Sequence, residues 1–171
     1  MGRRCALRAL AGAAVACPFV ASAAEPALPG PRGEVLLTVT GRIAVTNADN
    51  PARLDRELML AMGTSELITR TPFTDGVSTF MGILVARLLD RLGATGTELR
   101  TTALNDYAVV IPVAEVRAYP VLLALSRDGN TLSTRERGPL WVIYPWSDYP
   151  ELDDRAHRQR SIWQLSAIEV A

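Results

Sequence analysis

The stretch VLLALSRDGNTLSTRERGPLWVIYP, residues 121–145, carries the local signals that decide the fold class. It opens with the apolar run Val121–Ser126 and closes with a second apolar run, Leu140–Tyr144, and both runs indicate buried strands. Asp128-Gly129, between them, is a dipeptide typical of a tight turn. Two short strands so close in the chain favour a sheet with antiparallel neighbours.

Further strands are predicted on both sides of this stretch, because short apolar and β-branched runs alternate with turn signals. The segment 146–160 is polar, contains Pro150 and is predicted to be irregular. The additional predicted strands are Val35–Gly41, Glu66–Phe73, Glu98–Ala103, Tyr107–Pro112 and Ser161–Val170.

Two helices are predicted between the strands from apolar residues at helical spacing. The first begins at Asn50, a good N-cap followed by Pro51, and ends at Gly63. The second covers Phe80–Leu92 and ends at Gly93. Strands outnumber helices, so the sequence predicts an α+β fold: one compact domain with a mixed β-sheet core and short helices.

Composition limits the classes of function. The 171 residues are 49% hydrophobic, which suits one globular domain and excludes a disordered chain. The 18 basic side chains are balanced by 18 acidic ones. A nucleic-acid-binding protein normally carries a basic excess, so we expect no nucleic-acid partner.

The N-terminus has the three parts of a secretory signal peptide. Arg3, Arg4 and Arg8 form a positive region, Ala9–Val20 is mostly small or apolar, and Ala21-Ser22-Ala23 matches a cleavage site. We therefore expect residues 1–23 to be removed and the mature protein to be periplasmic. A lipoprotein acylated at Cys17 remains open as an alternative. Residues 24–33, rich in Pro and Gly, are predicted to be a flexible lead-in to a domain spanning 34–171.

Cysteine and histidine are scarce. Cys5 and Cys17 both lie in the predicted signal, so the mature chain has no thiol for a disulfide, a nucleophile or a metal–thiolate site. His157 is the single histidine, which argues against a zinc cluster or a hydrolase triad. We expect no metal site and no catalytic residue of these kinds.

Aromatic residues gather near the C-terminus, and two of them have an open interpretation. Trp146 stands in a polar loop, where it is either a core residue or a platform for a flat ligand. Trp163 lies on the predicted last strand, whose alternation does not decide which face it occupies. Trp141, inside an apolar strand, is predicted to be core.

Two polar groups also allow two interpretations. Asn105-Asp106-Tyr107 suits a turn between strands, but the same trio can present amide, carboxylate and phenol groups to a heterocycle. Glu151, Asp153 and Asp154 suit a solvated loop, and three such carboxylates can also bind Ca²⁺. Their spacing is not that of an EF-hand loop, which favours the solvated loop.

Six segments carry recognisable motifs in order along the chain: VLLTVTG at 35–41, FMGILVARLLDRLG at 80–93, LNDYAVVIP at 104–112, LLALSRDGNTL at 122–132, GPLWVIYP at 138–145 and SIWQLSAIEV at 161–170. Taken in this order, they resemble the molybdopterin-binding domain of the sulfite oxidase family. That family has a strand ending in T-G, a W-x-G-x-x-L-x-x-L-L helix, a D-G-Y strand, an N-G turn, a G-P-L-R strand and a final I-E-V strand. The resemblance covers nearly all of the predicted mature chain.

Departures from the family pattern bear on function. The family ligates molybdenum through a Cys just before the W-x-G helix, whereas Ile68–Gly76 has none, and Trp141 replaces the Arg of G-P-L-R. The chain is also shorter than the enzymes. The signal peptide and the missing Cys make it similar to small periplasmic pterin-binding regulators of this fold, which act on transmembrane cyclic-di-GMP enzymes or sensor kinases.

This resemblance implies a pterin site and no molybdenum. It implies Trp163 as the stacking platform with Trp146 second, Asn105 or Asp106 at the amino-oxo edge of the ring, and Arg160 on the ligand's side chain or carbonyl. Ser161, next to Arg160 in the family's Lys/Arg-Ser position, and Tyr107 complete the expected site. The alternatives are a molybdopterin-dependent oxidoreductase and an interaction protein without a ligand.

Overall fold

The computed structural model describes residues 27–47 and 51–171. The predicted signal peptide, residues 1–23, and the expected N-cap Asn50 lie outside the described residues. The strands are β1 (Val35–Gly41), β2 (Ala52–Asp55), β3 (Ser65–Thr71), β4 (Thr74–Leu84), β5 (Glu98–Ala103), β6 (Ala108–Pro112), β7 (Leu122–Arg127), β8 (Asn130–Thr131), β9 (Trp141–Ile143) and β10 (Leu165–Val170). The helices are α1 (Arg56–Ala61), α2 (Val85–Arg91), α3 (Val113–Ala118) and α4 (Arg155–Arg160), with 3₁₀ turns η1 (Thr134–Glu136) and η2 (Pro150–Leu152).

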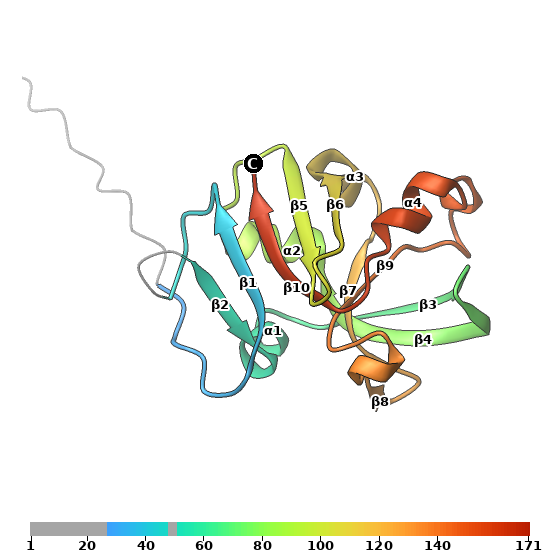
Figure 1. Ribbon diagram of the computed structural model, residues 1–171, viewed down its shortest axis with the longest axis horizontal. Helices are drawn as coiled ribbons and strands as arrows, with labels where there is room; N and C mark the ends of the chain where they lie inside the picture. Colours follow the sequence, from blue (N-terminus) through green and yellow to red (C-terminus); the bar gives the residue numbers. More distant parts are fainter. Residues whose placement is uncertain (1–26, 48–50) are drawn as a thin grey trace, which may run out of the picture.

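The strands form two sheets, which confirms the predicted α+β class (Figure 1). The first sheet has the order β2-β1-β10-β5-β6, and β10 pairs parallel with β1 and antiparallel with β5. The second has the order β3-β4-β7-β8, with β9 also paired to β7. The first sheet is mixed, because the C-terminal strand β10 inserts beside β1 at its centre.

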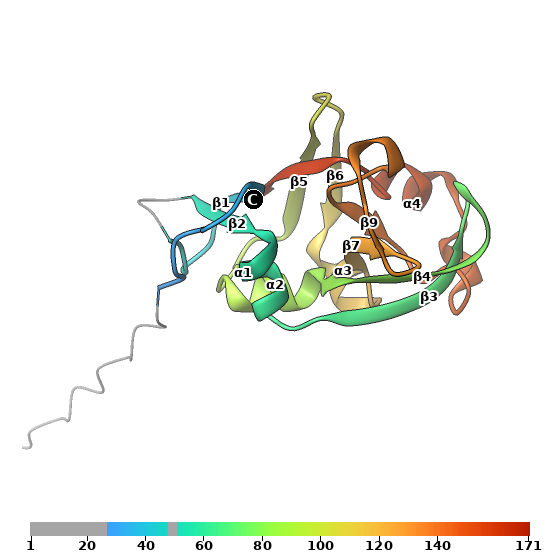
Figure 2. The same cartoon turned by 90° about the horizontal axis from the view of Figure 1, so that it is seen from below.

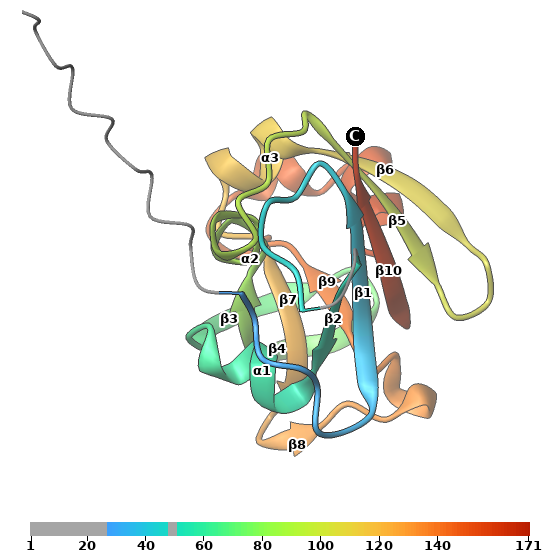
Figure 3. The ribbon, with the colours of Figure 1, turned by 90° about the vertical axis from the view of Figure 1, so that its left-hand side faces the viewer.

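The core lies against one face of the first sheet. Leu37 and Val39 of β1 are fully buried, while their neighbours along the strand are at least partly exposed, as the two-residue period of a strand requires. Figure 3 shows α1, α2 and α3 on the same side of this sheet. The opposite face carries polar side chains such as the Arg100–Glu169 ion pair.

Several elements that were predicted from strong local signals are present in the structure. β1 and β5 have the predicted bounds, and β7 turns at Asp128-Gly129, whose φ values of 50° and 81° suit a two-residue hairpin. Asp106, with φ of 64°, takes the left-handed conformation in the predicted turn between β5 and β6. Gly63, with φ of 103°, follows α1 as expected of a helix end.

The prediction of a helix over Phe80–Leu92 was wrong in its first half. Phe80 and Gly82 alternate with exposed residues on β4, and only Val85–Arg91 is helical. The register of β4 and β7 shifts between Met81 and Gly82. Ile83 is buried as well, so the buried positions of this segment imitate helical spacing. A Cβ on Gly82 would meet the carbonyl oxygen of Leu123 at 2.0 Å, which explains the glycine.

The first predicted helix was also placed too early. Residues 52–55 form β2, which pairs with β1, and α1 begins only at Arg56. Asp55 is the N-cap: its Oδ1 accepts from the Leu58 amide at 2.8 Å. Its Oδ2 accepts from the amides of Arg32 and Gly33 at 2.7 and 2.9 Å, which ties the end of the predicted lead-in to the domain.

The second sheet ends in a long arm. β3 and β4 run side by side away from β7, and Figure 2 shows their connection near α4. The connection carries Phe73, which packs edge-on against Trp163 at 5.3 Å between ring centroids. The arm therefore brings residue 73 to the segment between α4 and β10.

Candidate functional site

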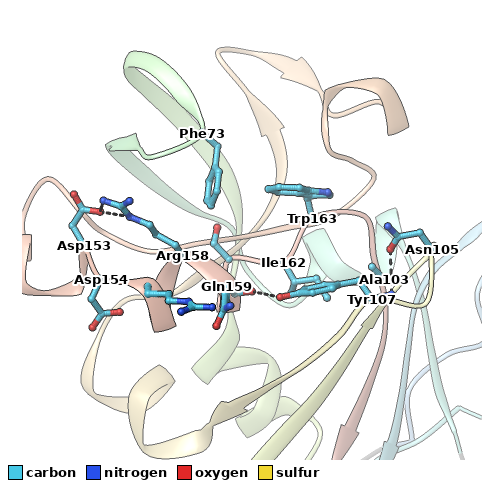
Figure 4. A pocket seen from close by; sticks show the side chains of 12 residues that line it. Phe73, Ala103, Asn105, Tyr107, Asp153, Asp154, Arg158, Gln159, Ile162 and Trp163 are labelled. Carbon is cyan, nitrogen blue, oxygen red and sulfur yellow. Dashed lines mark hydrogen bonds and ion pairs between the residues drawn. The ribbon is translucent and has the colours of Figure 1, made fainter.

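A pocket of about 620 Å³ opens between the β5–β6 hairpin tip, the β3–β4 connection and α4. In the view of Figure 4, Phe73 and Trp163 lie along one side and Tyr107 along the other. Asn105 lies toward one end and Asp153 toward the opposite end. The lining residues are Phe73, Ala103, Asn105, Tyr107, Asp153, Asp154, Arg155, Arg158, Gln159, Ser161, Ile162 and Trp163.

Trp163 is the most accessible tryptophan of the chain, with 37% of its surface exposed. It precedes β10 and forms only an isolated bridge to Trp141, because Gln164, with φ of 54°, interrupts the extended backbone. Phe73 and Trp141 contact its ring edge-on, and the Arg137 guanidinium lies 5.4 Å from its centroid. These contacts hold the ring in place where it lines the pocket.

The predicted position of Trp163 on the last strand was wrong, although the residue lines the pocket. The last strand begins at Leu165, not at Ser161. Ser161 is buried, and its hydroxyl donates to the Val142 carbonyl at 2.6 Å and accepts from Trp141 Nε1 at 3.1 Å. Ser161 therefore fastens this segment to β9, and its hydroxyl is already engaged.

The hairpin tip contributes two of its three predicted residues. Asn105 Oδ1 accepts from the Tyr107 amide at 3.3 Å, and within the described residues its amide Nδ2 has no hydrogen bond. The Tyr107 hydroxyl donates to the Gln159 carbonyl at 3.3 Å, which links the tip to α4. Asp106 makes the turn and is absent from the pocket lining, so the turn interpretation holds for that residue.

Trp146 lies in the core and does not line this pocket. It is 2% exposed, and its Nε1 donates to the Leu152 carbonyl at 3.0 Å. The polar sequence around it reflects its neighbours Ser147 and Asp148, which are exposed while the indole turns inward. The core interpretation of Trp146 therefore replaces the platform interpretation.

Arg160 points to a buried carboxylate instead of the pocket. Its Nη1 donates to Glu115 Oε2 at 2.5 Å, and the Tyr144 hydroxyl donates to Glu115 Oε1 at 2.5 Å. His157 Nε2 lies 3.5 Å from Glu115 Oε2, and its Nδ1 lies 3.0 Å from Asp154 Oδ1. Burial, followed by the hydrogen bond to Glu115, raises the pKa of Tyr144 above its usual range, so the phenol stays protonated.

This group of side chains anchors α4. Glu115 comes from α3 and Tyr144 follows β9, so one carboxylate joins three parts of the chain. Asp154 caps α4, and its Oδ1 accepts from the His157 amide at 2.9 Å. That backbone hydrogen bond, with a smaller contribution from the His157 side chain, lowers the pKa of Asp154.

Sequence reasoning missed what α4 supplies to the pocket. The segment 146–160 was predicted to be irregular, but η2 and α4 lie within it, and α4 presents Arg155, Arg158 and Gln159 to the pocket. Asp154, followed by six residues without Gly or Pro, was a usable N-cap signal. The carboxylates do not gather as a calcium site would require: Asp153 Oδ1 instead takes Arg158 Nε and Nη2 at 2.9 and 2.8 Å.

The position expected for the family's cysteine lies in the β3–β4 connection. Its hydroxyls bond to neighbouring groups: Thr71 Oγ1 and Thr74 Oγ1 lie 2.8 Å apart, and Thr69 Oγ1 accepts from the Ser147 amide at 3.0 Å. Hydroxyls are poor substitutes for a soft thiolate ligand, so the donor set there does not fit a protein-ligated molybdenum.

Over residues 27–47 and 51–171, no group of three or more His, Cys, Asp or Glu side chains is arranged to hold a metal ion. In the same ranges, no helix has the length and hydropathy needed to cross a membrane.

Comparison of the structure with solved structures gave 29 matching chains. Among them is the sulfane dehydrogenase SoxCD from Paracoccus pantotrophus, with a TM-score of 0.57 and 16% sequence identity. The match covers 78% of this chain and 37% of that chain. The fold is molybdopterin-domain-like.

This sulfite-oxidase-type fold was predicted from the ordered motifs, and the match confirms it. At 16% identity the match shows the fold alone. No protein-family model matches the sequence. The search of curated proteins likewise found no significant match.

Proposed function

We propose that this protein is a non-catalytic, periplasmic pterin-binding protein that senses a reduced pterin and regulates a membrane-bound signalling protein. The pocket beside Trp163 carries the proposal, because it combines an aromatic platform with polar groups that are free to bind. The molybdopterin-domain-like fold supports the choice of a pterin among flat heterocycles.

The requirements of a pterin are specific. Its flat bicyclic ring needs an aromatic surface, and its 2-amino-4-oxo edge needs both hydrogen-bond donors and acceptors. Trp163 and Tyr107 supply aromatic surface to the pocket. The Asn105 amide is available within the described residues and offers a donor to the 4-oxo group. Stacking of a base on an aromatic side chain contributes about 1–3 kcal/mol in nucleic-acid complexes, and we expect a similar contribution here.

The proposed binding residues are therefore Trp163, Tyr107 and Asn105, with Gln159 added from α4. Asp106 and Ser161 take structural roles instead. Arg160 is assigned to the anchor with Glu115, and Trp146 to the core. This smaller set keeps the predicted location of the ring and changes which groups read it.

The proposed location and partner are supported by the sequence and by the family resemblance. The signal-peptide pattern at residues 1–23 supports export to the periplasm. The resemblance to small periplasmic regulators supports a partner with a periplasmic domain, either a cyclic-di-GMP enzyme or a sensor kinase. N-terminal sequencing of the exported protein should find Ala24 or Glu25 as the first residue. If palmitate labels Cys17, the lipoprotein alternative is supported instead.

The fold also supports a second candidate, a molybdopterin-dependent oxidoreductase. This candidate needs a molybdenum ligand, and the threonine hydroxyls of the β3–β4 connection do not fit that role. Elemental analysis after native expression separates the two functions. One molybdenum atom per chain would support the oxidoreductase and contradict the non-catalytic proposal.

The direct test is calorimetric titration of the purified protein with a reduced pterin, together with mass spectrometry of small molecules released from natively purified protein. We expect stoichiometric binding and a pterin among the released molecules. If no pterin binds and none is released, the proposal fails, and the protein is better described as an interaction protein without a ligand.

A further inference from the structure

The charged side chains at the α4 end of the pocket differ in whether they have a partner inside the protein. Asp153 Oδ1 is occupied by two nitrogens of Arg158, at 2.9 and 2.8 Å. Asp154 Oδ1 accepts from the His157 amide and faces His157 Nδ1 at 3.0 Å. Arg155 also lines the pocket, but among the described residues its guanidinium has neither a hydrogen bond nor an ion pair. Two aspartates and two arginines thus line this end, and Arg155, which is exposed to solvent, is the arginine that no described side chain holds.

The geometry of a pterin connects this charge to the ligand. Its amino-oxo edge and its C6 substituent lie at opposite ends of the fused rings. Figure 4 shows Asn105 and Asp153 at opposite ends of the pocket. A ring on Trp163 whose edge meets Asn105 therefore directs its C6 substituent toward α4.

The pocket also has room for such a substituent. Sites of about 300–1,000 Å³ hold drug-sized ligands, which are larger than a bare bicyclic ring. At about 620 Å³, this pocket lies within that range. The space beyond the ring borders α4, where the guanidinium of Arg155 can form charge-assisted hydrogen bonds with an anion.

We infer that the preferred ligand is a pterin with an anionic C6 substituent, a carboxylate or a phosphate ester, whose charge pairs with Arg155. This inference rests on the proposed pterin-binding function and adds the chemical class of the substituent. Arg155 acts as a specificity-determining residue, because a neutral substituent of similar size would keep the stack on Trp163 and lose only the ion pair.

The test compares three reduced probes on the full chain: 7,8-dihydro-6-hydroxymethylpterin, which is neutral, its phosphate ester, and 7,8-dihydropterin-6-carboxylate. At low salt we expect at least one anionic probe to bind about 3- to 10-fold more tightly than the neutral one. The preference should shrink as ionic strength rises. A stronger preference for the phosphate or for the carboxylate identifies the anion.

Two variants locate the effect. Arg155→Gln should abolish the preference for the anionic probes over the neutral one and leave the affinity for the neutral probe unchanged. Arg91→Gln is the matched control, because Arg91 is an exposed arginine on α2 outside the pocket, and it should keep the preference. Melting temperatures equal to that of the wild type will show that both variants fold.

The outcomes separate this inference from the proposed function. Equal affinities for neutral and anionic probes, or a preference that survives Arg155→Gln, would overturn the inference while pterin binding stands. If none of the three probes binds, both the proposed function and this inference are contradicted.

Discussion

The pocket beside Trp163 and a groove along β1, which Val35, Leu36 and Thr38 help to line, differ in chemistry more than in size. The groove is the larger, at about 1,070 Å³ against about 620 Å³. Its lining contains no aromatic side chain, whereas Phe73, Tyr107 and Trp163 line the pocket. A flat ring can stack on an aromatic side chain in the pocket and not in the groove, so we expect the kind of surface, and not the volume, to select the binding site.

The two hollows also differ in what supports them. α4 forms one wall of the pocket and is anchored by the buried carboxylate of Glu115. One wall of the groove includes Asp55, the N-cap of α1, which also holds the amides of Arg32 and Gly33. Glu115 and Asp55 can be substituted separately, and we expect each substitution to affect only the hollow that its side chain supports.

The largest expected effect is on stability at the pocket side. Glu115→Ala leaves the Tyr144 hydroxyl and the Arg160 guanidinium without their shared partner. We expect the free energy of unfolding to fall by about 2–3 kcal/mol. This is at or below the low end of the range for a broken buried ion pair, because Arg160 is partly exposed to solvent. Denaturant unfolding measures this loss, and weaker pterin binding should accompany it. Unchanged stability would show that the anchor does not hold α4.

The same group of side chains should make the folded protein less stable at alkaline pH. The folded-state pKa of Tyr144 is raised above its ordinary value of 10.0, mainly by burial. The folded protein therefore holds this proton more tightly than the unfolded chain does, and the resulting stability is present below pH 10 and lost as the pH rises above it. Tyr144→Phe should flatten this alkaline decline in the melting temperature. A decline of the same slope in that variant would assign it to other groups.

Loss of the stacking platform is the next effect in size. Trp163→Ala should weaken reduced-pterin binding by about 5- to 150-fold, from a stack of about 1–3 kcal/mol. Trp163 is 37% exposed but packs against Phe73 and Trp141, so the melting temperature should fall by less than loss of a fully buried tryptophan would cause. Calorimetry and thermal melting on the same variant separate the two roles. Unchanged affinity in a folded variant would remove Trp163 from the site.

On the groove side we expect a smaller effect on stability alone. Asp55→Ala removes the N-cap of α1 and the acceptor of the Arg32 and Gly33 amides, so it should lower the free energy of unfolding by about 1–2 kcal/mol, with no change in pterin affinity. Backbone hydrogen bonds, that from Leu58 first, lower the folded-state pKa of Asp55 from 3.8. Its contribution is thus present above pH 3.8 and lost as the pH falls toward the lowered value. Acid denaturation at unchanged pH in the variant would show that other carboxylates dominate.

The smallest expected effect is a control inside the groove. Thr38 lines the groove on β1 and lies outside the pocket. Thr38→Ala should change neither the melting temperature nor the affinity for a reduced pterin measurably. A loss of affinity equal to that of Trp163→Ala would move the ligand to the groove and reverse the comparison.

Local signals in the sequence predicted much of the fold, but contacts between distant residues decided the rest. β1, β5 and the Asp128-Gly129 turn follow from short patterns that need no tertiary information. The extension of β4 to Leu84 depends on pairing with β7, about 40 residues later, so apolar spacing alone gave a helix.

The site shows the same division. The motif resemblance brought Asn105, Tyr107 and Trp163 together, and all three line one pocket. It could not show that Arg160 is paired with Glu115, because that partner lies 45 positions away in sequence. Polar side chains in a local motif can thus be assigned to a ligand when they are already satisfied inside the protein.

The most direct test of pterin binding in the pocket is a two-dimensional ¹⁵N NMR titration that follows the indole N–H signals of the three tryptophans. Trp141 and Trp146 are buried and donate to Ser161 and Leu152, whereas Trp163 lines the pocket. A reduced pterin should shift the Trp163 signal strongly and leave that of Trp146 nearly unchanged. The assignment of the site would be contradicted if a saturating pterin left the Trp163 indole signal unshifted, or if it shifted only the backbone amide signals of groove residues.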